Sequence, residues 1–423
     1  MKLKALILAE VCNPEWASLP NFSFKLFKGI SENVEVVLVT SIRNKASFAR
    51  NYDGPAEIVF IDTEYIAKPF YWLAKGIEKI RLGSWMTKMA LKYLPYIEFE
   101  RQAWKTLKAR INGGEFDIAH RISPVSPTLP SPFSIWAPIP FILGPINGGL
   151  KWPHQFASSL RKEREFIIFL REAYKYLPYY KRSMQSSTKI LSAFPHIDED
   201  LKEFEAKIVR LDELGINTSE FFPSPSPKTK KSSLVFLFVG RLVPYKNPDV
   251  VLEAFIESNI LSNHTLKIVG DGPEMASLNK THTENGASKN IKFLGWRNSD
   301  EIAEIMREAD VFVFPTIREV GGNVIVEAMA SGLPCIVCDY GGPRTLISDE
   351  RGIKIELKQK LEMKHDLRIA MEKLAADPLL RTSLGLAALN YAQSHYDWKN
   401  KGRAVSEIYK ETIKGVTNEH SLD

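Results

Sequence analysis

Short apolar runs of strand length alternate with segments of helical period throughout the second half of the sequence, and a glycine or proline follows most of these runs. The expected strands are Ser233–Val239, Leu266–Val269, Ile291–Leu294, Val311–Phe314 and Cys335–Cys338. Strands that alternate with helices form parallel sheets, because each helix returns the chain across one face of the sheet. The pattern predicts a Rossmann-like α/β domain whose ligand lies at the carboxyl ends of the strands.

The first half repeats this alternation less regularly, so a second domain of the same kind is expected there. Its expected strands are Lys4–Ala9, Val34–Val39, Ile58–Ile61, Asp117–His120, Phe141–Leu143 and Lys189–Ser192. A polar, proline-rich stretch just before Ser233 is typical of a linker. We predict an N-terminal domain over residues 1–222, a linker over 223–233 and a C-terminal domain over 234–395, which suits a chain of 423 residues.

The composition excludes several classes of protein. With 44% hydrophobic and 25% charged residues, the chain resembles ordinary globular proteins rather than disordered or fibrous ones. A formal net charge of +6 is too small for a dedicated nucleic-acid binder, and three cysteines cannot form a disulfide framework in a chain of this length. Residues 122–150 carry no charge, but seven prolines oppose a membrane-spanning helix, so a loop, a strand and a turn are expected there.

Two glutamates in an E-x7-E segment, Glu319 and Glu327, flank the start of an expected helix. Gly321 and Gly322 lack side chains, so a phosphate can approach the first free N–H groups of that helix at the positive end of its dipole. Glu327 lies four residues after Asn323 on the same helix face, and a carboxylate there suits hydrogen bonds to a ribose diol. Glu319 would lie in the preceding loop, within reach of whatever is attached beyond the phosphates.

Glycine turns follow other expected strands and bring cationic side chains with them. Gly240 follows Ser233–Val239, with Arg241 at the edge of the turn and Lys246 five residues on. Two cations beside a glycine turn suit a diphosphate, because the backbone can approach it closely while the side chains neutralise its charge. Further turns of this kind contain Gly270 and the pair Gly341-Gly342.

In this order, the motifs resemble the nucleotide-sugar-binding domain of family 4 retaining glycosyltransferases of the GT-B fold, the glycosyl transferases group 1. The matching segments are Gly240-Arg-Leu with Lys246-Asn247, Gly270-Asp-Gly-Pro273, Phe293-Leu-Gly295, Ala309–Pro315, Glu319–Glu327, Glu327–Pro334 and Gly341-Gly342. The resemblance implies α/β architecture with two facing Rossmann-like domains, each with a parallel sheet. It also implies a C-terminal helix, expected over residues 396–423, that crosses back to the first domain.

The resemblance further implies a role for each matching residue. Arg241 and Lys246 would neutralise the donor diphosphate and the charge that develops on the leaving group. Glu319 would hold hydroxyls of the transferred sugar, and Glu327 would hold the ribose. The expected donor-binding residues are Gly240, Gly270, Gly321, Gly322, Asn323, Val324 and Glu327. No protein general base is expected, since the departing phosphate is proposed to take the acceptor proton in this family. No metal is expected either, because the histidines lack the spacing of a metal site, and no cofactor is expected beside the nucleoside-diphosphate sugar.

The acceptor is expected to bind to the first domain, where the resemblance is weaker. His120 ends an expected strand, where family members often place a histidine near the transferred sugar, and we include it among the expected catalytic residues; the alternative is a buried core histidine. The turn Gly144–Gly149 ends another strand, and the alternative is a plain turn. The acceptor candidates are Glu15, Trp16, Asn147, Gly148 and Gly149.

The chain is therefore expected to be a retaining, metal-independent hexosyltransferase. It would move a sugar from a nucleoside-diphosphate sugar to a glycan or lipid-linked acceptor, in cell-surface or exopolysaccharide synthesis. A GT-B-fold nucleotide-sugar epimerase and a non-catalytic partner subunit remain the alternatives. The motifs leave open the base, the sugar, the acceptor and the linkage.

Two segments of the first domain hold the excess of positive charge. Residues 67–111 carry ten Lys or Arg against three acidic residues, and residues 161–189 carry eight against three, with aromatic residues between them. This pattern suits an anionic membrane surface; solvated helix faces are the alternative. We expect a cytoplasmic protein, peripheral at the inner face of the membrane, with no nucleic-acid partner. Two spacings typical of metal sites, Cys335-x-x-Cys338 and Asp198-x-Asp200, are interpreted as core and as solvated surface.

Overall fold

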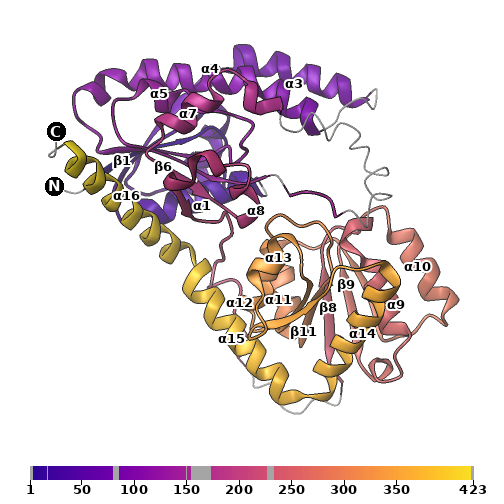
Figure 1. Ribbon diagram of the computed structural model, residues 1–423. Helices are drawn as coiled ribbons and strands as arrows, with labels where there is room; N and C mark the ends of the chain where they lie inside the picture. Colours follow the sequence, from indigo (N-terminus) through magenta and orange to yellow (C-terminus); the bar gives the residue numbers. More distant parts are fainter. Residues whose placement is uncertain are drawn as a thin grey trace. The chain divides into compact units, whose positions relative to one another are not determined.

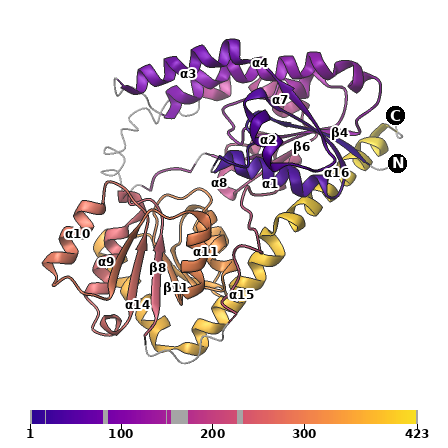
Figure 2. The same cartoon turned by 180° about the vertical axis from the view of Figure 1, so that it is seen from behind.

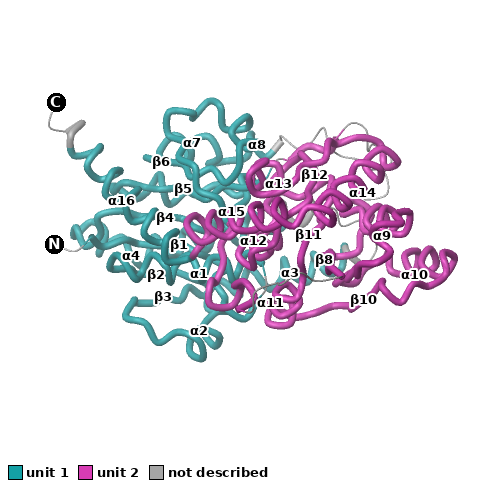
Figure 3. The backbone as a smooth tube through the Cα atoms, turned by 90° about the horizontal axis from the view of Figure 1, so that it is seen from below, with its two compact units in different colours: residues 1–149, 163–213, 398–423 teal, residues 150–162, 214–397 magenta. Residues whose placement is uncertain are grey.

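The computed structural model describes residues 3–16, 18–79, 85–148, 150–153, 173–225 and 233–420. The chain divides into two compact units (Figure 3). Unit 1 consists of residues 1–149, 163–213 and 398–423, and unit 2 of residues 150–162 and 214–397. The domain bounds given above stay predictions; the chain passes from unit 1 to unit 2 after Glu213, and most of the expected linker lies outside the described residues.

The described part of unit 1 is built on one parallel sheet of seven strands in the order β3-β2-β1-β4-β5-β6-β7. The strands are β1 (Lys4–Ala9), β2 (Glu35–Ser41), β3 (Glu57–Ile61), β4 (Ile118–Ser123), β5 (Phe141–Ile146), β6 (Lys189–Ser192) and β7 (Ile208–Arg210). The helices are α1 (Leu19–Ser31), α2 (Lys45–Asn51), α3 (Glu64–Lys79), α4 (Trp85–Asn112), α5 (Phe133–Trp136), α7 (Tyr180–Ser186), α8 (Pro195–Asp198) and α16 (Trp398–His420).

Alternate side chains of the strands form two cores, one on each face of this sheet. Leu6 of β1 packs in one core with Phe99 of α4, whereas Ile7 packs in the other with Phe27 of α1 and Tyr409 of α16. Successive strand residues point to opposite faces, so a strand buried on both sides is apolar throughout. Helices α4, α5 and α7 therefore cover one face, and α1 and α16 cover the other (Figure 1).

The C-terminal helix α16 belongs to unit 1, although the preceding helix α15 belongs to unit 2. It packs closely along α1, and the two helices lie side by side in both views (Figures 1 and 2). Glycines allow this approach: a Cβ on Gly29 would lie 2.5 Å from Trp398 O, and one on Gly402 would overlap the backbone of Gly29. The predicted return of the C-terminal helix to the first domain is confirmed.

Unit 2 contains six described parallel strands in the order β10-β9-β8-β11-β12-β13. They are β8 (Val235–Val239), β9 (Thr265–Val269), β10 (Ile291–Gly295), β11 (Val311–Phe314), β12 (Cys335–Cys338) and β13 (Gly352–Ile355). The helices are α9 (Pro248–Ile256), α10 (Met275–Glu284), α11 (Ser299–Glu308), α12 (Asn323–Ala330), α13 (Gly341–Leu346), α14 (Lys360–Ala376) and α15 (Pro378–Tyr396). The strand order reverses between β8 and β11, and ligands of such sheets bind outside the carboxyl ends at this switch point.

The predicted fold class is therefore confirmed: two Rossmann-like units, each with a parallel sheet. Every strand expected from the sequence is present, with bounds that differ by a few residues, and β7 and β13 are additional. In the charge-free stretch the expected strand is present as β5, whereas the expected loop also contains the short helix α5, and β5 extends to Ile146 into the expected turn. No helix among the described residues is long and apolar enough to cross a membrane.

Candidate donor site in unit 2

The glycine turns after β8 and β9 lie backbone against backbone. Gly270 has φ +132°, and a Cβ built on it would overlap the carbonyl group of Gly240. Gly240 N–H donates to Val269 O over 3.0 Å, and Leu242 N–H donates to Asp271 O over 2.9 Å. Only glycine tolerates both the positive φ and the close contact. These bonds fix the turn that carries Arg241, whose side chain is exposed.

Lys246 and Glu319 meet at the switch point. Lys246 ends a 3₁₀ turn after β8, and Glu319 lies in the loop after β11. The Nζ atom of Lys246 is 3.2 Å from Oε2 of Glu319, with the two side chains 17% and 23% exposed. The same ammonium group lies 5.0 Å from the ring centroid of Phe314 at the end of β11. The residue predicted to bind the diphosphate, Lys246, and the residue predicted to bind the sugar, Glu319, are thus neighbours.

Helix α12 begins directly after this loop. Gly322 precedes its first residue with φ +105°, and any residue with a side chain would be strained there. Asn323 Nδ2 donates to Glu327 Oε1 over 2.6 Å, and Asn323 Oδ1 accepts from Gly215 N over 3.4 Å. The first N–H groups of a helix have no partner within the helix, so those at the start of α12 can bind an anion.

The first residues of α13, which follows β12, contact the Glu319 loop. Gly342 N–H donates to Glu319 O over 2.9 Å, and a Cβ on Gly342 would overlap Gly321 O. A Cβ on Gly341, where φ is +61°, would lie 2.5 Å from Glu319 O. The Gly341-Gly342 pair, which the sequence indicated only as a turn, therefore sets the position of the loop that carries Glu319.

Unit 2 thus brings most of the predicted donor residues to the ends of three neighbouring strands. Gly240 and Gly270 touch, Lys246 contacts Glu319, and Glu319 is followed by the helix start that carries the remaining residues Gly321, Gly322, Asn323, Val324 and Glu327. Sequence reasoning missed Trp152, Tyr245 and Arg318, which lie beside this group. Tyr245 lies within the segment Gly240–Lys246 but was given no role there, and no local signal distinguishes Trp152 or Arg318.

His120 lies in unit 1, in the interior of β4, and is fully buried. Its Nε2 lies 2.7 Å from Gly144 O and its Nδ1 lies 2.6 Å from the Tyr409 hydroxyl. Because a carbonyl only accepts, Nε2 carries the proton and Nδ1 accepts from Tyr409. Burial lowers the pKa of His120 to about 3, so the ring is neutral. These contacts favour the core-histidine alternative, and we leave His120 out of the catalytic group.

The other described acceptor candidates belong to unit 1 and follow β1 and β5 in the chain. Glu15 forms an ion pair with Arg50 at 2.7 Å, and hydrogen bonds from Arg50 and Asn51 lower the pKa of Glu15 to about 2. Trp16 is 45% exposed. Glu15 is thus engaged by neighbouring side chains of α2, while the Trp16 ring faces solvent.

The Asn147 side chain donates from Nδ2 to Glu213 Oε1. Burial, followed by the charge of Asp212, raises the pKa of Glu213 to about 8, so this carboxyl group holds a proton at neutral pH. Gly148 follows with φ +145°, and Gly149 lies outside the described residues. Sequence reasoning did not indicate Glu213 as a member of this group, because it comes from a distant part of the chain.

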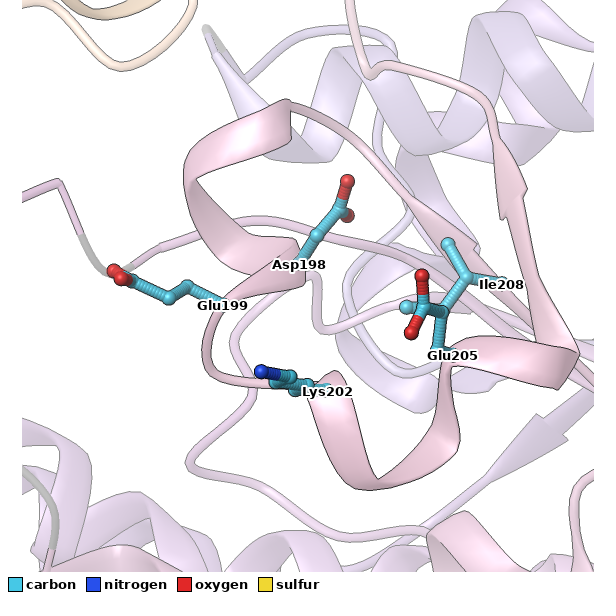
Figure 4. A pocket seen from close by; sticks show the side chains of 5 residues that line it. All are labelled: Asp198, Glu199, Lys202, Glu205 and Ile208. Atoms are coloured by element: carbon cyan, nitrogen blue, oxygen red, sulfur yellow. The ribbon is translucent and has the colours of Figure 1, made fainter.

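The two aspartates of the Asp198-x-Asp200 spacing contact polar and basic side chains of the protein. Asp198 accepts hydrogen bonds from Ser192 and Arg210, and Asp200 lies 3.6 Å from Lys175. A shallow pocket beside α8 is lined by Asp198, Glu199, Lys202, Glu205 and Ile208 (Figure 4). Among the residues that the structure describes, no cluster of three His, Cys, Asp or Glu side chains could hold a metal ion. Cys335 and Cys338 are buried on β12, as interpreted.

The two wound parallel sheets and the C-terminal helix that returns to unit 1 define a GT-B architecture. Residues 220–388, which contain all the donor motifs, match the family model described as Glycosyl transferases group 1. The resemblance inferred from the motifs is confirmed over this part of the chain. The structure of Anabaena HepE in complex with UDP has the same fold, with a TM-score of 0.63 and 16% identity over 97% of this chain and 100% of that one.

Two curated relatives are similar over part of their length. The chain is 30% identical over 259 residues to the UDP-Gal:alpha-D-GlcNAc-diphosphoundecaprenol alpha-1,3-galactosyltransferase of Escherichia coli, covering 57% of this chain and 63% of that protein. It is 28% identical over 246 residues to the D-inositol 3-phosphate glycosyltransferase of Streptomyces bingchenggensis, covering 53% of each. The chain thus spans between half and two thirds of the length of these relatives.

Proposed function

We propose that the protein is a retaining glycosyltransferase that moves a sugar from a nucleoside-diphosphate sugar to a glycan or lipid-linked acceptor. The observation that carries this proposal is the contact between Lys246 and Glu319 beside the free N–H groups that open α12. A cation, a carboxylate and a helix N-terminus at one switch point match the diphosphate and the sugar hydroxyls of such a donor.

In the structure, Lys246 and Glu319 are paired with each other. When a diphosphate binds, Lys246 exchanges Glu319 for a phosphate oxygen, and Arg241 adds a second cation from the turn after β8. The Glu319 carboxylate then accepts hydrogen bonds from sugar hydroxyls. Cations placed where negative charge develops on the leaving group stabilise the transition state more than the ground state, which is the requirement for catalysis.

Glu327 would bind the ribose. Its Oε1 accepts from Asn323, so the carboxylate is oriented along the first turn of α12. The Glu327 carboxylate would accept hydrogen bonds from the ribose diol, while the N–H groups of residues 321–324 would donate hydrogen bonds to the phosphates and the sugar. The nucleoside is thereby placed on one side of the helix start and the sugar on the other.

Retention of configuration results when the acceptor attacks the face from which the leaving group departs. We propose that the bond between sugar C1 and the phosphate oxygen breaks, that the acceptor oxygen bonds to C1 on the same face, and that the acceptor proton passes to the departing phosphate. The proposed reaction uses neither a metal ion nor a cofactor beside the nucleoside-diphosphate sugar. The engagement of both His120 ring nitrogens supports a route without a histidine base.

Incubation with a panel of UDP-, GDP- and ADP-sugars tests the proposal against its two alternatives. Hydrolysis of the donor to free sugar and nucleoside diphosphate, or release of nucleoside diphosphate with transfer of the sugar to an added acceptor, supports the transferase. Interconversion of the donor sugars supports a GT-B-fold epimerase, and binding of none supports a non-catalytic subunit. The anomeric configuration of the product, measured by NMR, tests retention, and activity in the presence of EDTA tests metal independence.

A lipid-linked acceptor, in cell-surface or exopolysaccharide synthesis, is the acceptor class that we propose. The acceptor in the name of the Escherichia coli relative is itself a diphosphoundecaprenol. Helix α3 exposes Tyr71, Trp72 and Leu73, and Lys75 Nζ lies 4.9 and 5.5 Å from the Tyr71 and Trp72 rings. Aromatic side chains next to lysines suit the interface of an anionic membrane, so we place the protein at the inner face of the membrane.

Sedimentation with vesicles tests this surface. We expect binding to phosphatidylglycerol vesicles that weakens with salt, and little binding to phosphatidylcholine vesicles. The double variant Tyr71→Ser/Trp72→Ser should lose most of this binding, whereas Leu379→Ser, which changes an 84% exposed side chain of unit 2, should retain it. Equal binding of wild type to both vesicle types would reject the anionic membrane as a partner.

A further inference from the structure

A short segment of unit 2, residues 150–153, contacts the loops of the donor site although it precedes the rest of the described unit by some sixty residues in the sequence. Leu150, Lys151, Trp152 and Pro153 are separated in sequence from the rest of the described unit 2 residues, yet the chain's contacts assign them to this unit. Each of the first three touches a different partner. Leu150 is buried, and its Cδ2 would lie 3.0 Å from a Cβ on Gly341. Lys151 O accepts a hydrogen bond from the Tyr340 hydroxyl over 2.6 Å.

Trp152 makes the contacts that matter most for the donor site. Its ring meets the Tyr245 ring edge to face, with centroids 6.3 Å apart and an interplanar angle of 88°. The Arg318 guanidinium lies 4.6 Å from the Trp152 ring centroid. Edge-to-face aromatic pairs and cation–π pairs both depend on geometry, so they hold side chains in defined positions.

The two partners of Trp152 are the immediate neighbours of the proposed catalytic residues. Tyr245 precedes Lys246, and Arg318 precedes Glu319. The two loops are also joined through the backbone, because Tyr245 O accepts from Ile317 N over 2.9 Å and from the Thr316 hydroxyl over 3.2 Å. Trp152 therefore joins by side chains the same two loops whose Lys246 and Glu319 meet at 3.2 Å.

Glu327, the residue proposed to bind the ribose, and its partner Asn323 are held by other contacts. Glu327 and Asn323 bond to each other, and Asn323 accepts from Gly215. The Trp152 ring contacts Tyr245 and Arg318, which are the sequence neighbours of Lys246 and Glu319. Loss of the Trp152 ring should therefore disturb the diphosphate and sugar contacts of a donor more than its nucleoside contacts.

We infer that Trp152 is a positioning residue of the donor site, which holds the Tyr245-Lys246 and Arg318-Glu319 segments for the sugar diphosphate. This inference rests on the proposed function and extends it to a residue outside the donor motifs. Trp152 acts through Tyr245 and Arg318, which hold Lys246 and Glu319 in place. A small displacement of reacting groups has a large effect on rate, so loss of these contacts should slow the reaction.

The test compares Trp152→Ala, Trp152→Phe and the matched control Trp136→Ala. Trp136 forms a similar edge-to-face pair with Tyr179 in unit 1, with centroids 6.3 Å apart. We expect Trp152→Ala to lower kcat/KM for the donor identified in the panel by roughly 10- to 100-fold. Its affinity for the matching nucleoside monophosphate should stay within about twofold of wild type, Trp152→Phe should recover much of the activity, and Trp136→Ala should resemble wild type.

A second variant keeps the inference testable if Trp152→Ala folds poorly. Arg318→Gln removes the cation but not the ring, and we expect the same selective loss of donor turnover. Where Trp152→Ala folds, its combination with Arg318→Gln should cost less than the sum of the single effects, because both act through one contact. Unchanged kcat/KM in Trp152→Ala, or an equal loss of affinity for monophosphate and donor, would overturn the inference. A wild-type protein that binds no nucleotide sugar would overturn the proposed function itself.

Discussion

Lys246 Nζ lies 3.2 Å from Glu319 Oε2, although the two residues come from loops after different strands. Both side chains are mostly shielded from solvent, which makes it costly to leave either charge without a partner. A cation and a carboxylate held at the switch point of a parallel sheet are better explained by a ligand than by stability, since such pairs contribute little to folding.

Replacement of Lys246 by alanine should abolish most sugar transfer while the fold persists. A cation that stabilises the leaving group typically contributes about 100- to 1,000-fold to the rate, so we expect kcat to fall by at least about 100-fold. The measurement is donor turnover together with the melting temperature. Lys267→Ala is the matched control, because Lys267 forms a 2.6 Å ion pair with Glu308 in the same unit. Near-normal turnover of Lys246→Ala would reject the proposed diphosphate site.

Replacement of Glu327 by alanine should weaken nucleotide binding itself. Loss of a hydrogen bond from a charged group to the ribose typically costs about 1.5–3 kcal/mol, or roughly 10- to 150-fold in affinity. Isothermal titration calorimetry with the nucleoside diphosphate measures this change in affinity. Glu308→Ala, which removes a 65% exposed carboxylate, serves as the control. If Glu327→Ala binds the nucleotide as tightly as wild type, Glu327 does not hold the ribose.

A side chain at Gly342 should displace the loop that carries Glu319. A Cβ there would overlap Gly321 O and lie 2.5 Å from Val320 O. We expect Gly342→Ala to destabilise the protein by about 1–3 kcal/mol, as overpacking does, and to lower donor turnover. Gly415→Ala on α16, where nothing lies within 4 Å of the new Cβ, should be neutral or stabilising. Denaturant unfolding compares the two, and a fully stable, fully active Gly342→Ala would contradict the loop contact.

The buried Glu213 carboxyl should make stability depend on pH. Its pKa is raised from 4.5 to about 8 in the folded protein, chiefly by burial. Between these values the folded chain holds a proton that the unfolded chain has released, so this contribution is complete below pH 4.5 and is lost as the pH rises toward 8. Glu213→Gln should remove this slope and gain on the order of 5 kcal/mol above pH 8.

The wild type and Glu213→Gln should be unfolded in parallel across this range, because other groups also titrate. His120, with its lowered pKa, contributes the opposite slope: its stability is complete above pH 6.5 and is lost as the pH falls toward 3. The difference between the two proteins isolates Glu213. A difference that does not change with pH would show that Glu213 has an ordinary pKa.

The strands and donor loops could be predicted because their signals are local. Gly240, Gly270 and Gly322 stand where the backbone needs a close approach or a positive φ, and a single sequence reveals such needs. The surroundings of His120 could not be predicted, because its partner Tyr409 lies on the last helix. Trp152 and Glu213 were missed for the same reason, since their contacts depend on how distant segments pack.

The central claim is that unit 2 binds a nucleoside diphosphate through Lys246. Isothermal titration calorimetry of UDP, GDP and ADP with wild type and Lys246→Ala tests it most directly. We predict that wild type binds one of these nucleotides in a one-to-one complex and that Lys246→Ala binds it at least about tenfold more weakly, as expected for a lost charge-assisted contact. Equal affinity of the two proteins, or no binding of any of the three nucleotides to wild type, would contradict the claim.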